Sequence, residues 1–213
     1  MDPTAIVVGH SFVKRYAKWI GTRHSMAPRH HMEICGKLKD LEFLGQSGLQ
    51  SSELGDEHVF HASKYDIVIL DCASNDLANG ISIKTVVNNL LVFARRCIQD
   101  GATIVYIVSA LNRARRISSN SQDFAQTVRS FNNHLRQLCY DEDNISFHRI
   151  AGFTQQHDSA GELPIENWSD DSIHPSPYRR QPNQKSGMEK YHQALKTALH
   201  RAAQRFQTLK SQQ

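Results

Sequence analysis

Three short runs of apolar, mostly β-branched residues constrain the fold of this chain more than any other feature. They lie within residues 5–8, 66–70 and 103–108, of which the second begins with an aspartate and the third with a threonine, and each is followed directly by a glycine or a polar residue. Short apolar runs of this kind are typical of strands that are buried on both faces of a parallel sheet. We therefore expect each of the three segments to be a central strand.

Weaker strand signals and helical segments complete an alternating pattern. Residues 41–44 and 145–148 are further strand candidates, whereas residues 71–80 and 151–185 are predicted to be irregular because they are polar or rich in proline. Four stretches carry apolar side chains at helical spacing: residues 12–20, 81–99, 122–140 and 188–209. Strands that alternate with helices form parallel sheets with helices on both faces. We predict one three-layer α/β domain over residues 1–213.

Charge and hydropathy argue against two broad classes of protein. Lysine and arginine number 25 against 21 aspartates and glutamates, and a net charge of only +4 argues against direct nucleic-acid binding. The most apolar stretch, residues 103–111, is far shorter than the roughly 18 residues of a membrane-spanning helix. No secretion signal opens the chain, and its four cysteines lie far apart, so we expect a cytoplasmic protein with reduced thiols.

The motifs of nucleotide and metal sites are missing or incomplete. No Gly-x-Gly-x-x-Gly occurs, and the dipeptide Gly36-Lys37 is followed by Leu38 rather than by serine or threonine. The pairs His30-His31 and His58-x-x-His61 are not completed by a cysteine or carboxylate cluster with metal-ligand spacing. We therefore interpret these histidines as surface residues and expect neither a metal nor another cofactor.

Polar residues follow the predicted strands at the places where ligands collect. In an open α/β sheet, ligands bind at the carboxyl ends of the strands. Ser11 follows the first strand, the segment Gly45-Gln46-Ser47-Gly48 follows the second, and Asn75 lies in the loop after the third. Asp171 and His174 lie in the last irregular segment, just before the closing helix.

These residue types are those of acyl transfer. A serine hydroxyl becomes a useful nucleophile when an imidazole takes its proton, and an acid must hold that imidazole in the right tautomer. Asp171 lies three residues before His174, so one turn of chain can place its carboxylate against the ring, with Ser11 on the other side. Taken alone, Ser11 is better explained as the N-cap of the first helix, and Asp-x-x-His can be a surface turn.

The four blocks together resemble those of the SGNH (GDSL-type) hydrolases. Ser11 matches the nucleophile, Gly48 the glycine of the second block, and Asn75 the asparagine of the third, while Asp171 and His174 match the closing Asp-x-x-His. The resemblance implies a flavodoxin-like α/β fold with a mainly parallel sheet of about five strands. It also implies metal-independent ester hydrolysis, and the opening block is most similar to divergent esterase domains of animals, including some encoded by retrotransposons.

The resemblance also implies a role for each matched residue. Ser11 would attack the ester carbonyl, with His174 as base and then as acid, and Asp171 would orient His174. The backbone N–H groups of Ser11 and Gly48, together with the side-chain amide of Asn75, would form the oxyanion hole.

Two positions depart from the family pattern. His10 stands where the family usually has an aspartate before the nucleophile, and Ala73 stands two residues before Asn75 where the family has a glycine. If the backbone requires a positive φ at this position, alanine costs about 1 kcal/mol and misplaces the asparagine. Gly45 lies three residues before Gly48 on the same loop and is an alternative oxyanion donor.

We interpret the chain as a serine esterase that hydrolyses small acyl esters, such as acetyl esters of a carbohydrate or a lipid. The alternative is a catalytically inactive domain that serves as an interaction or nucleic-acid-associated module of a larger protein. Two further features each allow two interpretations. An arginine-rich segment binds an anionic substrate or is simply a solvated loop; its residues are Arg113, Arg115 and Arg116. Trp168 lines the acyl pocket or packs against its own loop. The acyl chain length, the alcohol and the oligomeric state remain open.

Overall fold

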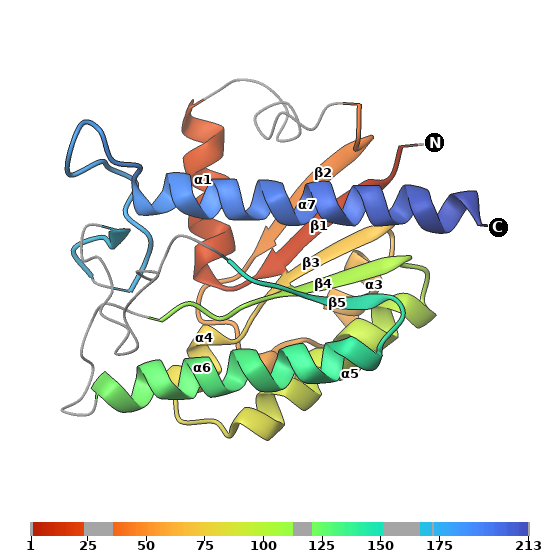
Figure 1. The fold of residues 1–213 in the computed structure, drawn as a ribbon, viewed down its shortest axis with the longest axis horizontal. Coiled ribbons are helices and arrows are strands. Elements are labelled where there is room, and N and C mark those ends of the chain that lie inside the picture. The colour runs from red at the N-terminus through yellow and green to blue at the C-terminus, as the bar shows by residue number, and fades with distance from the viewer. Residues whose placement is uncertain (1, 24–35, 113–120, 151–166, 172, 213) are drawn as a thin grey trace.

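Five parallel strands form one sheet in the order β2-β1-β3-β4-β5 (Figure 1). The computed structural model describes residues 2–23, 36–112, 121–150, 167–171 and 173–212. The strands are β1 Thr4–Gly9, β2 Asp40–Gly45, β3 Ile67–Asp71, β4 Ile104–Val108 and β5 Ile145–His148. This order is the flavodoxin-like arrangement, in which the order of the strands along the sheet reverses between β1 and β3. The predicted α/β class and parallel sheet are confirmed.

Helices cover both faces of this sheet. Helices α1 and α7 lie on one face, and α5 and α6 lie on the other (Figure 1). The helices are α1 Ser11–Arg23, α3 Asp56–Ala62, α4 Ser74–Ala78, α5 Ile83–Gln99, α6 Ser121–Leu138 and α7 Gly187–Ser211. Two short 3₁₀ turns, η1 Ser51–Glu53 and η2 Cys139–Asp141, complete the described elements.

The strands divide their side chains between two cores because successive side chains of a strand point to opposite faces. In β1, Ala5 and Val7 belong to the core under α1 and α7, whereas Ile6 and Val8 belong to the core under α5 and α6. All four side chains are fully buried. This double burial explains why the central strands are continuous apolar runs without polar alternation.

One segment that the sequence predicts as irregular contains a helix. The loop expected over residues 71–80 includes α4, which begins at Ser74 and ends at Ala78. Five residues form little more than one turn, which is too short to show a helical period of apolar side chains. The prediction was therefore wrong for this segment, and Asn75 lies on α4.

The amino end of α7 is packed tightly against the segment that precedes it. Ser186 caps the helix by accepting a hydrogen bond from the N–H of Glu189, whose carboxylate accepts one from the N–H of Ser186. A Cβ atom on Gly187 would lie only 1.8 Å from the carbonyl oxygen of Asn167, so only glycine fits there. The residues before α7 are thereby held close to its first turn.

Two further sequence expectations concern cysteines and membranes. Cys72, Cys97 and Cys139 are buried free thiols, and burial raises the pKa of Cys97 and Cys139 to about 12. Cys35 lies outside the described residues. Within the described part of the chain, no helix is long and apolar enough to cross a bilayer.

Candidate active site

Ser11 is the first residue of α1 and lies just beyond the end of the central strand β1. Strand β1 ends at Gly9, and α1 begins at Ser11. The backbone N–H of His10 donates a hydrogen bond to the carbonyl oxygen of Asp71 at the end of β3, 3.1 Å away. The serine is therefore held at the carboxyl edge of the sheet, at the topological switch point where open α/β sheets bind ligands.

His174 lies between Ser11 and Asp171 and contacts both, in the order that proton transfer requires. The Nε2 atom of His174 lies 2.8 Å from Oγ of Ser11, although 163 positions separate the two residues in the chain. On the other side of the ring, Nδ1 lies 2.7 Å from Oδ2 of Asp171. The imidazole thus bridges hydroxyl and carboxylate, and it is largely shielded from solvent, with only 12% of its side chain exposed.

Hydrogen bonds from its own turn hold the Asp171 carboxylate in its ionised form. Its Oδ1 accepts bonds from the backbone N–H groups of Ile173 and His174, both at 2.9 Å, and from the hydroxyl of Ser169 at 2.8 Å. Burial alone would raise the pKa of Asp171, but these bonds and the one from the His174 ring keep that pKa well below its ordinary value. Arg15 adds an ion pair at 3.2 Å from Oδ2.

The ring of His174 is fixed by packing as well as by hydrogen bonds. Its edge meets the ring of Phe12 at a centroid distance of 5.6 Å. The carbonyl oxygen of His174 accepts a hydrogen bond from the N–H of Ser169 at 2.8 Å, and the Ser169 hydroxyl oxygen lies 2.9 Å from the same carbonyl oxygen. Trp168 and Pro175, on either side of this turn, form an isolated β-bridge. The turn that carries Asp171 and His174 is therefore held in shape by hydrogen bonds between its own residues.

The loop of the second block is tied both to β1 and to Asn75. The N–H of Gln46 donates to the carbonyl oxygen of Gly9 at 3.0 Å, and the Asn75 amide donates to the carbonyl oxygen of Leu49 at 3.0 Å. The amide nitrogen of an asparagine carries two hydrogens, so this bond occupies one of them. Gly48, next to Leu49, has φ +80°, a conformation that favours glycine.

A buried carboxylate holds this loop in place. Asp76 accepts a hydrogen bond from the hydroxyl of Ser51 at 2.7 Å and another from its backbone N–H at 3.0 Å. Burial raises the pKa of Asp76, and the bonds from Ser51 partly offset that rise. Because Asp76 follows Asn75 on α4, its carboxylate fixes the position of the second-block loop relative to the asparagine.

The structure describes two positions whose roles the sequence left open. Ala73 has φ −144°, so the absence of a glycine there causes no left-handed strain before Asn75. Gly45 ends β2 against α1, where an added Cβ would lie 2.2 Å from the backbone nitrogen of Lys14. Gly45 is therefore required for close packing, whereas Gly48 lies in the exposed turn of the loop.

His10 belongs to a buried cluster beneath the nucleophile. Its Nδ1 accepts a hydrogen bond from the N–H of Phe12 at 3.3 Å, and its Nε2 lies 3.5 Å from Oδ1 of Asp71. The other carboxylate oxygen of Asp71 accepts a hydrogen bond from the hydroxyl of Tyr191 on α7. His10, in place of the family's aspartate, thus caps the start of α1 through its ring.

Several other residues singled out by the sequence lie elsewhere. Trp168 is fully buried in the core under α1 and α7, so it has the packing role. His61 pairs with Glu42 at 2.8 Å, and the described residues contain no group of three or more metal-ligating side chains. Five residues lie outside the described part of the chain: His30, His31, Arg113, Arg115 and Arg116.

Sequence reasoning missed two residues that contact the site. Arg15 lies four residues after Ser11, so the two side chains share one face of α1, and this spacing could have predicted the contact of Arg15 with Asp171. Asp76 is part of the third block, but its partner Ser51 is 25 positions away, and no local pattern indicates their pairing.

Comparisons with known proteins place this arrangement in a known fold. No protein-family model and no curated protein matches the sequence. The structure is similar to a GDSL-like lipase from Bacteroides thetaiotaomicron, with 15% identity, a TM-score of 0.69 and coverage of 93% of this chain and 88% of the lipase. An esterase from Pseudoalteromonas matches at 14% identity and a TM-score of 0.58, over 93% of this chain and 100% of its own. The catalytic domain of a peptidoglycan O-acetyltransferase from Streptococcus pneumoniae matches at 13% identity and a TM-score of 0.57, over 95% of each chain. From β1 to α7, the chain has the fold of the SGNH (GDSL-type) hydrolases.

Proposed function

We propose that this protein is a serine ester hydrolase that cleaves small acyl esters, and that Ser11, His174 and Asp171 are its catalytic residues. The observation that carries the proposal is the continuous hydrogen-bonded chain from Ser11 Oγ through the His174 ring to Asp171. A hydroxyl, an imidazole and an ionised carboxylate in this order are the groups that acyl transfer requires.

The geometry supports a two-step reaction. Oγ of Ser11 attacks the ester carbonyl while Nε2 of His174 takes its proton, and the same nitrogen then returns that proton to the departing alcohol. A water molecule, deprotonated by His174, next attacks the acyl-serine, and the proton goes back to Ser11 as the acid leaves. Asp171 accepts from the Nδ1–H of the ring and stabilises the imidazolium that forms at each step.

The oxyanion of each tetrahedral intermediate would be held by donors near the start of α1. The N–H of Ser11 is among the first of the helix and has no partner within it, and the positive end of the helix dipole favours negative charge there. Gly48 and Asn75 would supply the other donors, because the bond between Asn75 and Leu49 brings the second-block loop and α4 together.

Small acyl groups are the substrate class that we propose. Similar structures include an acetyl esterase, with 15% identity and a TM-score of 0.59, besides the peptidoglycan O-acetyltransferase domain. The substrate would be an acetyl-type ester of a carbohydrate or a lipid. Neither a metal nor another cofactor takes part in the proposed steps.

The test is covalent labelling of Ser11 together with turnover of a short-chain nitrophenyl ester. We expect a fluorophosphonate probe to label the wild-type protein on Ser11, and S11A and H174A to lose about 10⁴-fold or more in turnover. S130A serves as the matched control, because Ser130 is exposed on α6, on the opposite face of the sheet. An unlabelled wild-type protein with no turnover would favour the inactive interaction module instead.

A further inference from the structure

The side chain of His10, directly before the proposed nucleophile, is fully buried at the start of α1. The first N–H groups of a helix have no partner within it, and the residue before the helix commonly caps one of them with its side chain. Nδ1 of His10 does so by accepting a hydrogen bond from the N–H of Phe12, at 3.3 Å. His10 is therefore the N-cap of α1, and the hydroxyl of Ser11 contacts His174 instead.

This hydrogen bond determines which nitrogen of the His10 ring carries a hydrogen. In a neutral imidazole one nitrogen accepts and the other donates, so an accepting Nδ1 requires the hydrogen to be on Nε2. Nε2 lies 3.5 Å from Oδ1 of the buried Asp71, and the other oxygen of that carboxylate accepts a hydrogen bond from the hydroxyl of Tyr191. A carboxylate beside Nε2 favours the tautomer in which Nδ1 accepts from Phe12.

Phe12, whose N–H is held by this bond, is next to both proposed reacting groups. Its backbone follows Ser11 directly, and its buried ring packs against two imidazoles. The centroid distances are 4.4 Å to the ring of His10 and 5.6 Å to that of His174, and both contacts are edge to face. A displacement of Phe12 would therefore disturb the nucleophile on one side and the base on the other.

We propose that His10 is a positioning residue for ester hydrolysis, which holds Ser11 and its N–H in the orientation that attack and oxyanion binding require. This inference rests on the proposed function. Because the ring of His10 binds the N–H of Phe12, two successive N–H groups have different partners, and that of Ser11 serves the oxyanion. An aspartate at position 10 would place a second carboxylate beside Asp71, whereas the imidazole provides an acceptor for the helix and a hydrogen toward that carboxylate.

Two substitutions of His10 separate its accepting nitrogen from its bulk. H10L removes both ring nitrogens, whereas H10N keeps an acceptor because the asparagine Oδ1 takes the place of Nδ1. With a short-chain nitrophenyl ester, H10L should lower kcat by about 10- to 100-fold and change KM by less than about twofold. It should slow labelling of Ser11 by the fluorophosphonate probe to a similar extent. H10N should keep kcat within about threefold of the wild type.

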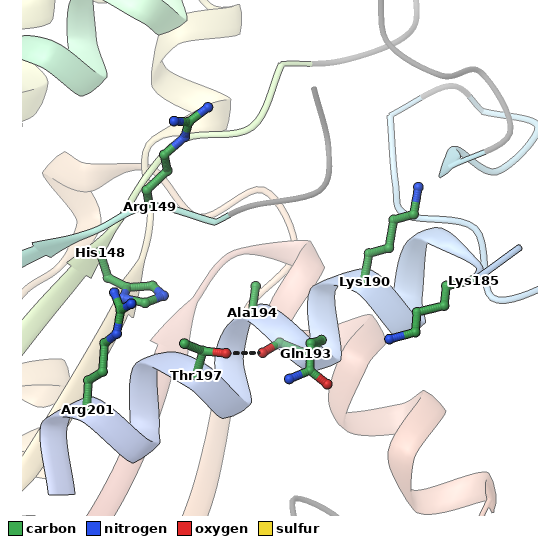
Figure 2. Close-up of a pocket in the computed structure, with 8 residues that line it drawn as sticks. All are labelled: His148, Arg149, Lys185, Lys190, Gln193, Ala194, Thr197 and Arg201. Carbon is green, nitrogen blue, oxygen red and sulfur yellow. Dashed lines mark hydrogen bonds between the residues drawn. The ribbon is translucent and has the colours of Figure 1, made fainter. Parts of the chain in front are cut away.

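The matched control is H148L, which removes another buried imidazole at the end of a strand. His148 is the last residue of β5, is 4% exposed, and lines a pocket beside α7 that none of the three proposed catalytic residues lines (Figure 2). H148L should keep kcat within about twofold when rates are normalised to the folded fraction from circular dichroism and urea unfolding. Wild-type kinetics in H10L, an equal loss in H10N, or an equal loss in H148L would overturn the role of His10.

Nitrogen NMR of the wild-type protein tests the same inference without catalysis, and it does not depend on the folding of H10L. The two ring nitrogens of a neutral imidazole resonate differently according to which one carries the hydrogen, and loss of signals in H10N assigns those of His10. We expect hydrogen on Nε2, and hydrogen on Nδ1 would overturn the proposal. Absence of turnover in the wild type would contradict the proposed function and this role together, whereas full turnover in H10L would contradict the role of His10 alone.

Discussion

The hydroxyl of Tyr191 on α7 donates a hydrogen bond to the buried carboxylate of Asp71 at the end of β3, across 120 positions of the chain. Both side chains are almost completely inaccessible to solvent. Because the backbone of Asp71 also accepts from the N–H of His10, this contact ties α7 to the residue before Ser11. The packing of α7 and the position of the nucleophile are therefore coupled.

Asp71→Asn should change how stability depends on pH. Burial raises the pKa of Asp71 to about 6, although the bond from Tyr191 opposes the rise. The folded state thus binds the proton of the Asp71 carboxyl more tightly than the unfolded chain does. The contribution of this proton to the stability of the fold is complete below pH 3.8 and is lost as the pH rises through 6. Between these two pH values, the free energy of unfolding of the variant should therefore rise by roughly 1–3 kcal/mol relative to that of the wild type. Urea unfolding of the variant and the wild type at several pH values measures this gain, and a pH-independent difference would contradict the prediction.

His148→Gln should show the opposite trend. The pKa of His148 is lowered by burial and by Arg201 to about 4, so the unfolded chain binds this proton more tightly. The stabilisation is present above pH 6.5 and is lost as the pH falls toward 4. The melting temperature of H148Q should therefore rise relative to that of the wild type as the pH falls from 6.5 toward 4. A constant difference in melting temperature would mean that His148 titrates normally.

Asp171→Asn should slow ester hydrolysis while leaving the fold intact. The amide can still contact Nδ1, but it cannot hold the charged imidazole, so kcat should fall by about 10³- to 10⁴-fold. The neighbouring D170N is the matched control, because Asp170 is exposed and has only a 3.9 Å ion pair with Arg180. Similar rates for D171N and D170N would remove Asp171 from the mechanism.

Asn75→Ala tests the proposed oxyanion hole. Removal of one donor should lower kcat by about 10²- to 10³-fold with little change in KM, because the bond strengthens only as the oxyanion forms. N88A, an exposed asparagine of α5, should leave both constants unchanged. Since Asn75 also bonds Leu49, circular dichroism and urea unfolding of N75A are needed beside the kinetics. A rise in KM alone would assign Asn75 to substrate binding.

Gly45→Ala should destabilise the protein, whereas Gly21→Ala should not. The new methyl group at position 45 would meet the backbone of Lys14, and such overpacking costs about 1–3 kcal/mol or more. Gly21 lies within α1 with no atom in the way, so alanine there should add about 0.5–1 kcal/mol of helix stability. Chemical unfolding of the two variants compares them, and equal effects would contradict the close packing of β2 against α1.

The central strands, the longer helices and their alternation could be predicted because hydrophobic periodicity is a local property of the chain. Helix α4 could not be predicted in this way, because its five residues are too few to show the helical repeat of apolar side chains. At the site, the turn from Asp171 to His174 is equally local, and its hydrogen bonds form over three residues. The matched blocks indicated the other partners, but only by resemblance.

The sequence alone determined the class of fold and the residue types at the ends of its strands. Only the tertiary structure brought His174 to Ser11 and placed Tyr191 on Asp71. The reason is physical: a strand or helix records its pattern in neighbouring side chains, whereas contacts between distant residues depend on how the whole sheet and its helices pack.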